Sequence, residues 1–240
     1  MGYLFMSEMK NLAIIPARSG SKGLPDKNIK LLNNKPLLAY SIEVAQLSGT
    51  FDEIHVSTDS DKYAEIATKH GASVPFLRSK ETSSDTASSW DAVRETLNRY
   101  EHLGKHFSMV TLLQPTTPLR QPEDIRKAYE IFHARNANSV ISVCEVDHSP
   151  LWCNTLPEDH SLKDFLRPDV ITLPRQKLNT YYRINGAIYM IDVNFFMHSD
   201  SIYETNSIAY IMDKEKSIDI DDEFDFRLVE AIMRMNGCGL

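Results

Sequence analysis

The loop at residues 17–28 carries residue types suited to binding a polyphosphate. It holds two glycines and three cations against a single acid: Gly20, Gly23, Arg18, Lys22, Lys27 and Asp26. The glycines free the backbone to bend and to aim its N–H groups at an anion. The stretch has neither the GxxxxGK[ST] pattern of a Walker A loop nor the GxGxxG pattern of a dinucleotide site. A solvated, flexible loop is the alternative interpretation, but ligands bind at the carboxyl ends of parallel strands, and this loop directly follows the first predicted strand.

Asp219 and Asp221 are candidate metal ligands near the end of the chain. In an extended chain, residues two apart point the same way, so both carboxylates are presented on one face. Hard oxygen ligands that leave room for water and phosphate suit Mg²⁺. The alternative is an acidic helix N-terminus, because Asp221, Asp222 and Glu223 lie at the start of the last predicted helix, where negative charge is favourable. Asp219 lies further out, between two isoleucines, and is harder to explain as a cap.

A third candidate is cationic. Arg175 and Arg183 stand eight residues apart at the end of an irregular stretch, and Arg183 is followed by Asn185 and Gly186. Arginine suits bidentate recognition of a carboxylate or phosphate. Two solvated surface arginines are the alternative interpretation.

Other patterns argue against several enzyme classes. His102 and His106 have helical spacing, but Gly104 interrupts the helix, which argues against a zinc site. There is no GxSxG nucleophile motif, and the three cysteines lack a catalytic context. Trp90 and Trp152 are interpreted as packing residues. The residues therefore predict a phosphate-handling enzyme that forms no covalent intermediate.

Alternating strands and helices must position these loops. Strands are predicted at residues 12–15, 54–57, 73–77, 109–113 and 139–146, and helices at 36–45, 61–70, from Ser84 or Asp85 to about 102, and from 122 onwards. Short, wholly apolar runs such as 12–15 are typical of strands covered on both faces. The repeated strand–helix order predicts a parallel sheet wrapped by helices.

The pattern changes at residues 148–182, which contain four prolines and only short apolar stretches. A segment of this length without periodicity is a functional excursion or a partner-binding arm. Strands are predicted again at 186–191 and 208–212. A final helix at 222–235 has Phe224, Leu228, Ile232 and Met235 on one face.

Composition limits the possible partners. The 240 residues carry 33 acids and 26 bases, for a formal net charge of -7, which is unlike a duplex-DNA binder. Three cysteines without a CxxC pair indicate reduced thiols. The first residues have no signal-peptide features, and no apolar run reaches the roughly 18 residues of a membrane span. We therefore expect a cytoplasmic protein that binds neither nucleic acid nor membrane.

Five motifs, in order along the chain, resemble those of the CMP-sialic acid synthetases (acylneuraminate cytidylyltransferases). They are Ile15 to Gly23 with Lys27-Asn28, Ser84-Asp85-Thr86-Ala87-Ser88-Ser89, Gln114 to Arg120, the segment from Arg175-Gln176 to Tyr189, and Ser217-Ile218-Asp219-Ile220-Asp221. They span residues 11 to 226, nearly the whole chain. The resemblance implies an α/β, Rossmann-like three-layer nucleotidyltransferase fold. It also implies a single domain over residues 1–240, in which 148–182 is a dimerisation arm, and therefore a homodimer.

The resemblance further implies that CTP and a sialic acid give CMP-sialic acid and pyrophosphate with Mg²⁺. The residues matching the family's nucleotide contacts are Arg18, Ser19, Gly20, Ser21, Lys22, Asn28, Arg78, Ala87 and Ser89. Those matching its sugar contacts are Gln114, Arg175, Arg183 and Asn185, and Arg175 is expected to reach a neighbouring subunit. Asp219 and Asp221 match the metal ligands. Arg18, Lys22 and Asp219 are the candidate catalytic residues, and we hypothesise Asp219 as the proton acceptor.

The sugar itself is left open. Sialate-specific relatives can carry a lysine where this chain has Trp152, and a large apolar group there suggests a less polar sugar tail. N-acetylneuraminate and N,N′-diacetyllegionaminate both remain candidates. CMP-pseudaminate and CMP-Kdo synthetases are the rival enzymes, and a nucleotide-binding module without catalysis is the rival outside enzymes. The positive charge is expected to gather around one polyanion site, with Arg120 among its cations.

Overall fold

The computed structural model describes residues 10–20, 23–235 and 237. Its centre is a six-stranded sheet. The strands, in spatial order, are β4 (Glu53–Ser57), β1 (Asn11–Pro16), β5 (Met109–Leu112), β7 (Tyr182–Asp192), β6 (Ser139–Glu145) and β8 (Ser207–Ile211). β1 pairs in parallel with β4 and β5, and β6 with β8, whereas β7 is antiparallel to both of its neighbours. The predicted parallel strands are therefore confirmed, but β7 separates β5 from β6.

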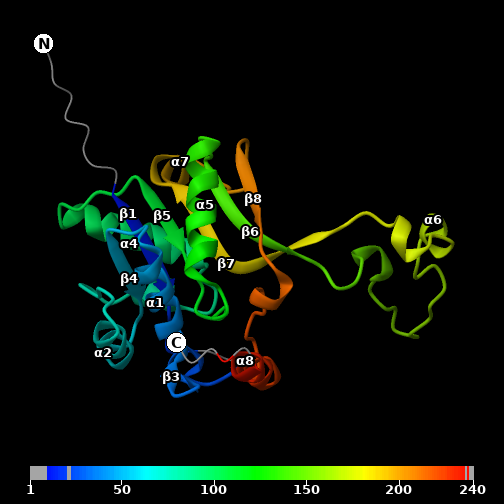
Figure 1. Cartoon of the computed structure of the whole chain (residues 1–240), viewed down its shortest axis with the longest axis horizontal. Coiled ribbons are helices and arrows are strands. Elements are labelled where there is room, and N and C mark those ends of the chain that lie inside the picture. Colours follow the sequence, from blue (N-terminus) through cyan, green and yellow to red (C-terminus); the bar gives the residue numbers. More distant parts are fainter. Residues whose placement is uncertain (1–9, 21–22, 236, 238–240) are drawn as a thin grey trace, which may run out of the picture.

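Helices cover both faces of the sheet, as the wholly apolar first strand predicts (Figure 1). Ala13 and Ile15 pack with α1 (Leu37–Ser48), α2 (Asp61–Lys69) and α5 (Pro122–Ala134). Leu12 and Ile14 point to the other face and pack with α4 (Ser89–His102) and α7 (Val193–His198). The alternation of side chains along β1 thus builds two cores, and the predicted three-layer α/β fold is confirmed.

The region between β4 and α4 differs from the sequence prediction. The strand predicted at 73–77 is a single bridge between Ser73 and His55. The helix predicted from Ser84 or Asp85 begins only at Ser89, as α4, and a short helix that was not predicted, α3 (Lys80–Ser83), precedes it. Ser79 caps α3, and Ser88 caps α4 in a reciprocal capping box with Asp91. Several serines in this stretch are competent caps, so the sequence alone could not select among them.

The last helix, α8 (Glu223–Met235), packs with a different face from the one predicted. Phe226, Val229 and Met233 are buried, whereas Phe224 and Met235 are exposed. The buried face meets the hairpin of β2 (Leu31–Leu32) and β3 (Lys35–Pro36), which comes after the short helix η1 (Lys27–Ile29). Contacts with Leu24, Leu32 and Ile220 form a third apolar cluster, and this cluster fixes the 219–221 segment beside the loop after β1.

The segment between β6 and β7 leaves the body of the molecule and returns to it (Figure 1). It contains only short helices, namely η2 (Pro150–Trp152), α6 (Pro168–Ile171) and η3 (Arg175–Lys177). Leu156, Leu162 and Ile171 are exposed on it. The irregular excursion predicted at 148–182 is therefore present. A further short helix, η4 (Lys214–Lys216), connects β8 to the 219–221 segment.

Candidate functional site

A cavity of about 470 Å³ lies at the carboxyl ends of β1 and β5. Its lining includes eight of the predicted site residues: Arg18, Asn28, Arg78, Ala87, Ser89, Gln114, Asp219 and Asp221. They come from four stretches that are far apart in the chain. The fold thus brings a cationic loop, two aspartates and the Gln114 turn around one space. Ser21, Lys22 and the side chain of Arg175 lie outside the described residues.

The loop after β1 is held by side chains that turn into the protein. Arg18 lines the cavity, and its Nη1 lies 2.8 Å from the Asp85 carboxylate. Asn28 is buried and donates to the carbonyl of Arg18 at 3.1 Å. The Ser19 N–H and hydroxyl both donate to Asp59, at 2.8 and 3.0 Å. Ser19 therefore anchors the loop.

Lys27 joins this loop to the segment that carries the two aspartates. Its Nζ donates to the carbonyl of Ile220 at 2.6 Å and lies 3.5 Å from Oδ1 of Asp221. The close approach of the two segments also requires glycine at position 23, because a Cβ there would lie 2.7 Å from the carbonyl oxygen of Asp221. Lys27, one of the three cations predicted to bind a polyphosphate, lines the cavity. Its charge was visible in the sequence, but the direction of its side chain was not.

Asp219 is the most unusual group in the cavity. Its Oδ1 is buried and has no hydrogen-bond partner among the described residues. Burial raises the pKa of Asp219, the nearby Asp221 carboxylate acts in the same direction, and a hydrogen bond from Thr116 opposes them. Asp221 is exposed and lines the same cavity.

Two carboxylates fit a hard divalent cation that takes its other ligands from water and phosphate. The uncompensated Oδ1 of Asp219 is a ready oxygen ligand for such an ion. Within the described residues, no cluster of three or more His, Cys, Asp or Glu side chains could form an all-protein metal cage. The donor set therefore suits Mg²⁺ bound together with a phosphate substrate better than a structural zinc.

Arg78 brings a second guanidinium group to the cavity. Its backbone N–H donates to the carbonyl of Thr58 at 2.7 Å. Burial lowers the pKa of Arg78, while Glu95 and Asp59 oppose that shift. Its Nε is buried and finds no acceptor in the described part of the chain. A buried, incompletely paired guanidinium favours an anionic or carbonyl-bearing ligand.

Gly186 is a site residue that was not among the predicted ones. Its φ is +75°, and a Cβ there would lie 2.3 Å from Oε1 of Gln114. Only glycine adopts this backbone conformation without strain and leaves room for the Gln114 side chain. The Asn-Gly pair was a sequence signal, but the contact joins residues 72 positions apart and could not be read from it.

Neither of the two predicted sugar-binding residues on β7, Arg183 and Asn185, lines the cavity. Asn185 is 1% exposed, its Oδ1 accepts from Ser142 at 2.6 Å, and its Nδ2 donates to Ser217 at 2.9 Å. Both ends of the amide are thus paired inside the protein, and the structure supports a positioning role for Asn185. Arg183 is exposed, and its Nη2 donates to the carbonyl of Ser217 at 2.9 Å.

Arg120 was expected among the cations of the site, and that expectation is wrong. The side chain is 1% exposed and lies in the core. Its guanidinium donates to the carbonyl of Ala187 and to the hydroxyl of Ser41, both at 2.6 Å, and to the hydroxyl of Thr117 at 3.1 Å. Burial lowers the pKa of Arg120 to about 10. Arg120 is an internal strut that joins α1, β7 and the turn after β5.

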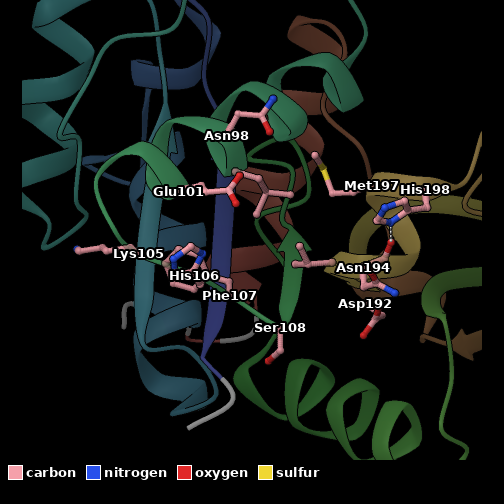
Figure 2. Close-up of a pocket in the computed structure, with 12 residues that line it drawn as sticks. Asn98, Glu101, Lys105, His106, Phe107, Ser108, Asp192, Asn194, Met197 and His198 are labelled. Carbon is pink, nitrogen blue, oxygen red and sulfur yellow. Dashed lines mark hydrogen bonds between the residues drawn. The ribbon is translucent and has the colours of Figure 1, made fainter. Parts of the chain in front are cut away.

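A second hollow, of about 490 Å³, lies at the opposite end of the sheet (Figure 2). Its wall includes Glu101, Lys105 and His106 on one side and Asn194 and His198 on the other. His198 is hydrogen-bonded to the carbonyl of Asn194 at 2.8 Å. None of the predicted site residues lines this hollow. The chemistry predicted from the sequence therefore concentrates at the other end of the sheet.

Comparison with known proteins adds independent findings. A family model described as cytidylyltransferase matches residues 12–230. A CMP-N,N′-diacetyllegionaminic acid synthase of Legionella pneumophila is 38% identical over 235 residues, which cover 95% of this chain and 98% of that protein. An N-acylneuraminate cytidylyltransferase of Streptococcus agalactiae is 40% identical over 220 residues, which cover 91% of this chain but 52% of the relative, so this chain spans about half of that protein's length.

The fold is also found in solved structures. A CMP:2-keto-3-deoxy-manno-octonic acid synthetase complexed with CTP superposes with a TM-score of 0.72 at 16% identity, covering 95% of this chain and 99% of the other. At this identity the likeness establishes a shared nucleotidyltransferase fold. In the described residues, no helix is both long and apolar enough to cross a membrane.

Proposed function

The chain belongs to the cytidylyltransferase family, and from this premise we propose that it couples CTP to an acidic nine-carbon sugar, giving the CMP-sugar and pyrophosphate. The observation that carries the proposal is one cavity lined by both Arg18 and Arg78 and by the pair Asp219 and Asp221. Guanidinium groups suit the triphosphate, and paired carboxylates suit the divalent ion that accompanies it.

The nucleotide lies, in this proposal, between the loop after β1 and the start of α4. Arg18 and the loop backbone face the phosphates, and Lys22, from its place in the sequence, joins them in balancing the charge on the departing pyrophosphate. Gly20 and Ser21 belong to the same loop. Arg78, Ala87 and Ser89 then surround the cytidine, which their shared place on the cavity wall supports.

The reaction needs little covalent chemistry from the protein. The anomeric hydroxyl of the sugar attacks the α-phosphorus, the bond from that phosphorus to pyrophosphate breaks, and the hydroxyl proton passes to Asp219. Positioning and charge neutralisation dominate such transfers. Gln114, which packs against Gly186 and lines the cavity, is proposed to lie where nucleotide and sugar meet.

Asp219 and Asp221 hold Mg²⁺ in this proposal. When bound, the ion supplies positive charge to the phosphate oxygens. The buried Oδ1 of Asp219, which lacks a partner within the described residues, and the exposed Asp221 beside it support this assignment.

The acidic sugar lies toward β7 and the excursion. Arg183 is proposed to bind its carboxylate, and Arg175 is proposed to do so from a neighbouring subunit. Trp152, with Asp147 and Tyr181, lines a hollow of about 360 Å³ where the excursion leaves the sheet. An indole there fits a sugar with a less polar tail, so N,N′-diacetyllegionaminate stands beside N-acetylneuraminate as a candidate.

The excursion at 148–182 is proposed to be the arm of a homodimer. Its exposed Leu156, Leu162 and Ile171 support this role, because a monomer gains nothing by presenting them to water. Light scattering should give a dimer mass for the wild type and a monomer mass for a variant with all three changed to serine.

A cytoplasmic location is proposed as well, and the unpaired thiols of Cys144 and Cys153 support a reducing compartment.

Pyrophosphate release from CTP tests the proposed function. The reaction is run with Mg²⁺ and, in separate arms, N-acetylneuraminate, N,N′-diacetyllegionaminate, pseudaminate and Kdo. We expect release only with a nine-carbon acid, and loss of that release in EDTA. Faster turnover of pseudaminate or Kdo would identify the rival synthetases. No release with any of the four acids would leave a nucleotide-binding module and refute the assignment.

A further inference from the structure

Arg78 is held by its backbone from both sides. The three consecutive residues Leu77, Arg78 and Ser79 each give a main-chain group to a fixed partner. The carbonyl of Leu77 accepts from Nη1 of Arg99 at 2.6 Å, and the Ser79 N–H donates to Oε1 of Glu95 at 3.0 Å. Between them, the Arg78 N–H donates to Thr58.

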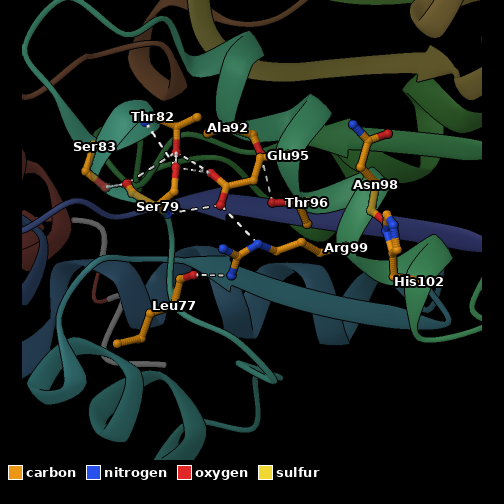
Figure 3. Close-up of polar contacts among 10 residues, drawn as sticks. All are labelled: Leu77, Ser79, Thr82, Ser83, Ala92, Glu95, Thr96, Asn98, Arg99 and His102. Carbon is orange, nitrogen blue, oxygen red and sulfur yellow. Dashed lines mark hydrogen bonds and ion pairs between the residues drawn. The ribbon is translucent and has the colours of Figure 1, made fainter.

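Glu95 is the centre of this network (Figure 3). Its carboxylate accepts from the hydroxyls of Ser79 and Thr82 as well as from the Ser79 N–H. Its Oε1 also lies 3.1 Å from Nε of Arg99, one turn further along α4. The Glu95 side chain is 15% exposed, so these bonds are made largely away from water. Charge-assisted bonds in such surroundings hold geometry well.

The network therefore ties α3 and residues 77–79, which precede it, to one face of α4. Ser79 is the N-cap of α3, so Glu95 holds that cap. α4 itself begins at Ser89, which lines the cavity together with Arg78. One carboxylate thus links the two elements that form this wall of the cavity. Glu95 is also the largest favourable charge acting on the pKa of Arg78, against the effect of burial.

We propose that Glu95, paired with Arg99, is a positioning residue that sets the affinity for CTP by fixing Arg78. The inference rests on the proposed function for the identity of the nucleotide. Glu95 does not line the cavity, so its effect must pass through Arg78 and its neighbours. Losing the carboxylate frees the backbone on one side of Arg78, and the long guanidinium side chain then samples more positions before nucleotide binds.

The test is a double-mutant cycle between Glu95→Gln and Arg78→Met, with the Kd of CTP measured by calorimetry in Mg²⁺. Glu95→Gln alone should weaken CTP binding about tenfold and raise the KM for CTP similarly, with kcat and the KM for the sugar within about threefold of wild type. In the Arg78→Met background it should add less than a twofold effect, because residues that act through one another are not additive. Glu101→Gln, an exposed carboxylate on the same helix, is the matched control and should leave all constants unchanged.

Equal effects of Glu95→Gln with and without Arg78 would overturn the inference, and so would a kcat loss at unchanged Kd. If Glu95→Gln does not fold, Arg99→Met frees the Leu77 carbonyl and measures the same coupling from the other side of Arg78. Glu95→Asp, which keeps the charge, should restore part of the affinity. If the wild type binds CTP but transfers its CMP group to no acid, the proposed function fails while the Kd cycle still decides this inference. If it does not bind CTP, both fail.

Discussion

At the scale of single residues, the cavity contains groups whose cost to the folded protein points to a ligand. The buried Oδ1 of Asp219 finds no hydrogen-bond donor among the described residues, and the buried Nε of Arg78 finds no acceptor there. Each such atom forfeits hydration without replacement, which typically costs about 1–3 kcal/mol. Both line one cavity. Opposite charges left incomplete at one place fit the proposed substrate, which carries phosphates together with a cation.

Asp219→Asn should lower kcat/KM for CTP at least 100-fold at saturating Mg²⁺, because it removes a metal ligand and the proposed proton acceptor together. Steady-state pyrophosphate release measures the effect. Asp222→Asn is the matched control: Asp222 accepts from the N–H groups of Phe224 and Asp225 at the start of α8, and asparagine caps a helix equally well. Near-normal turnover of Asp219→Asn would show that both roles proposed for Asp219 are wrong.

Gly186→Ala should displace Gln114 and lower kcat/KM about tenfold. A Cβ at position 186 would lie 2.3 Å from Oε1 of Gln114, and the φ of +75° adds strain of about 1–2 kcal/mol. Gly104→Ala separates the two effects, because Gly104 has a φ of +73° with no described atom within 4 Å of the added methyl. Urea unfolding should show a similar loss of stability in both variants, and only Gly186→Ala should lose activity. Equal activity of the two would place Gln114 outside the reaction.

At the scale of elements, the loops at the ends of the strands were predicted from the sequence more accurately than the contacts between elements. The loop after β1 was identified because ligands bind at the carboxyl ends of parallel strands, and the Gln114 turn because its motif resembles one of the CMP-sialic acid synthetases. The buried face of α8 was predicted wrongly because the helix has two apolar rows, one through Phe224 and one through Phe226. Docking against the β2–β3 hairpin, a long-range event, selects the second row. Periodicity shows that a helix has an apolar row, but not which of two rows meets a partner.

Arg120 is another element-scale feature that charge counting could not locate. Its guanidinium satisfies acceptors on α1, β7 and the turn after β5. Arg120→Met should therefore lower the free energy of unfolding by about 3 kcal/mol, because buried acceptors lose a charged donor. Arg126→Met, an exposed position on α5 paired with Glu123, should change it by less than about 0.5 kcal/mol. Urea denaturation measures both, and similar small losses would mean that Arg120 is not a strut.

At the scale of the whole molecule, the net charge of -7 conceals an uneven distribution. Arg18, Lys27 and Arg78 line the cavity, and Asp219 and Asp221 are the acids that face them. Asp85 lies just outside this lining, 2.8 Å from Arg18, so a polyanionic substrate meets three cations gathered around one space and partly balanced by acids. The sequence indicated that cations gather around one site, but the burial of Arg120 in the core shows that not every cation in a site motif faces the site.

The pH dependence of stability is also a property of the whole fold, and His55 dominates one part of it. The ring is buried among Phe76 and Tyr100, with centroids 5.0 and 5.4 Å away. Burial lowers the pKa of His55 from 6.5 to about 4, against opposing effects of Glu53 and Ser73. The folded protein therefore keeps His55 neutral, whereas the unfolded chain binds a proton there below about pH 6.5.

Between pH 6.5 and pH 4 the unfolded state thus binds more protons, so acid favours unfolding. The contribution of His55 is complete above pH 6.5 and is lost as the pH falls to about 4, a difference of about 3 kcal/mol. Urea unfolding at several pH values should show this loss in the wild type, and His55→Gln should flatten the slope by about one proton. His102→Gln, at an exposed position on α4, should keep the wild-type slope. An unchanged slope in His55→Gln would mean that the ring is protonated in the folded protein, and that the aromatic cluster tolerates its charge.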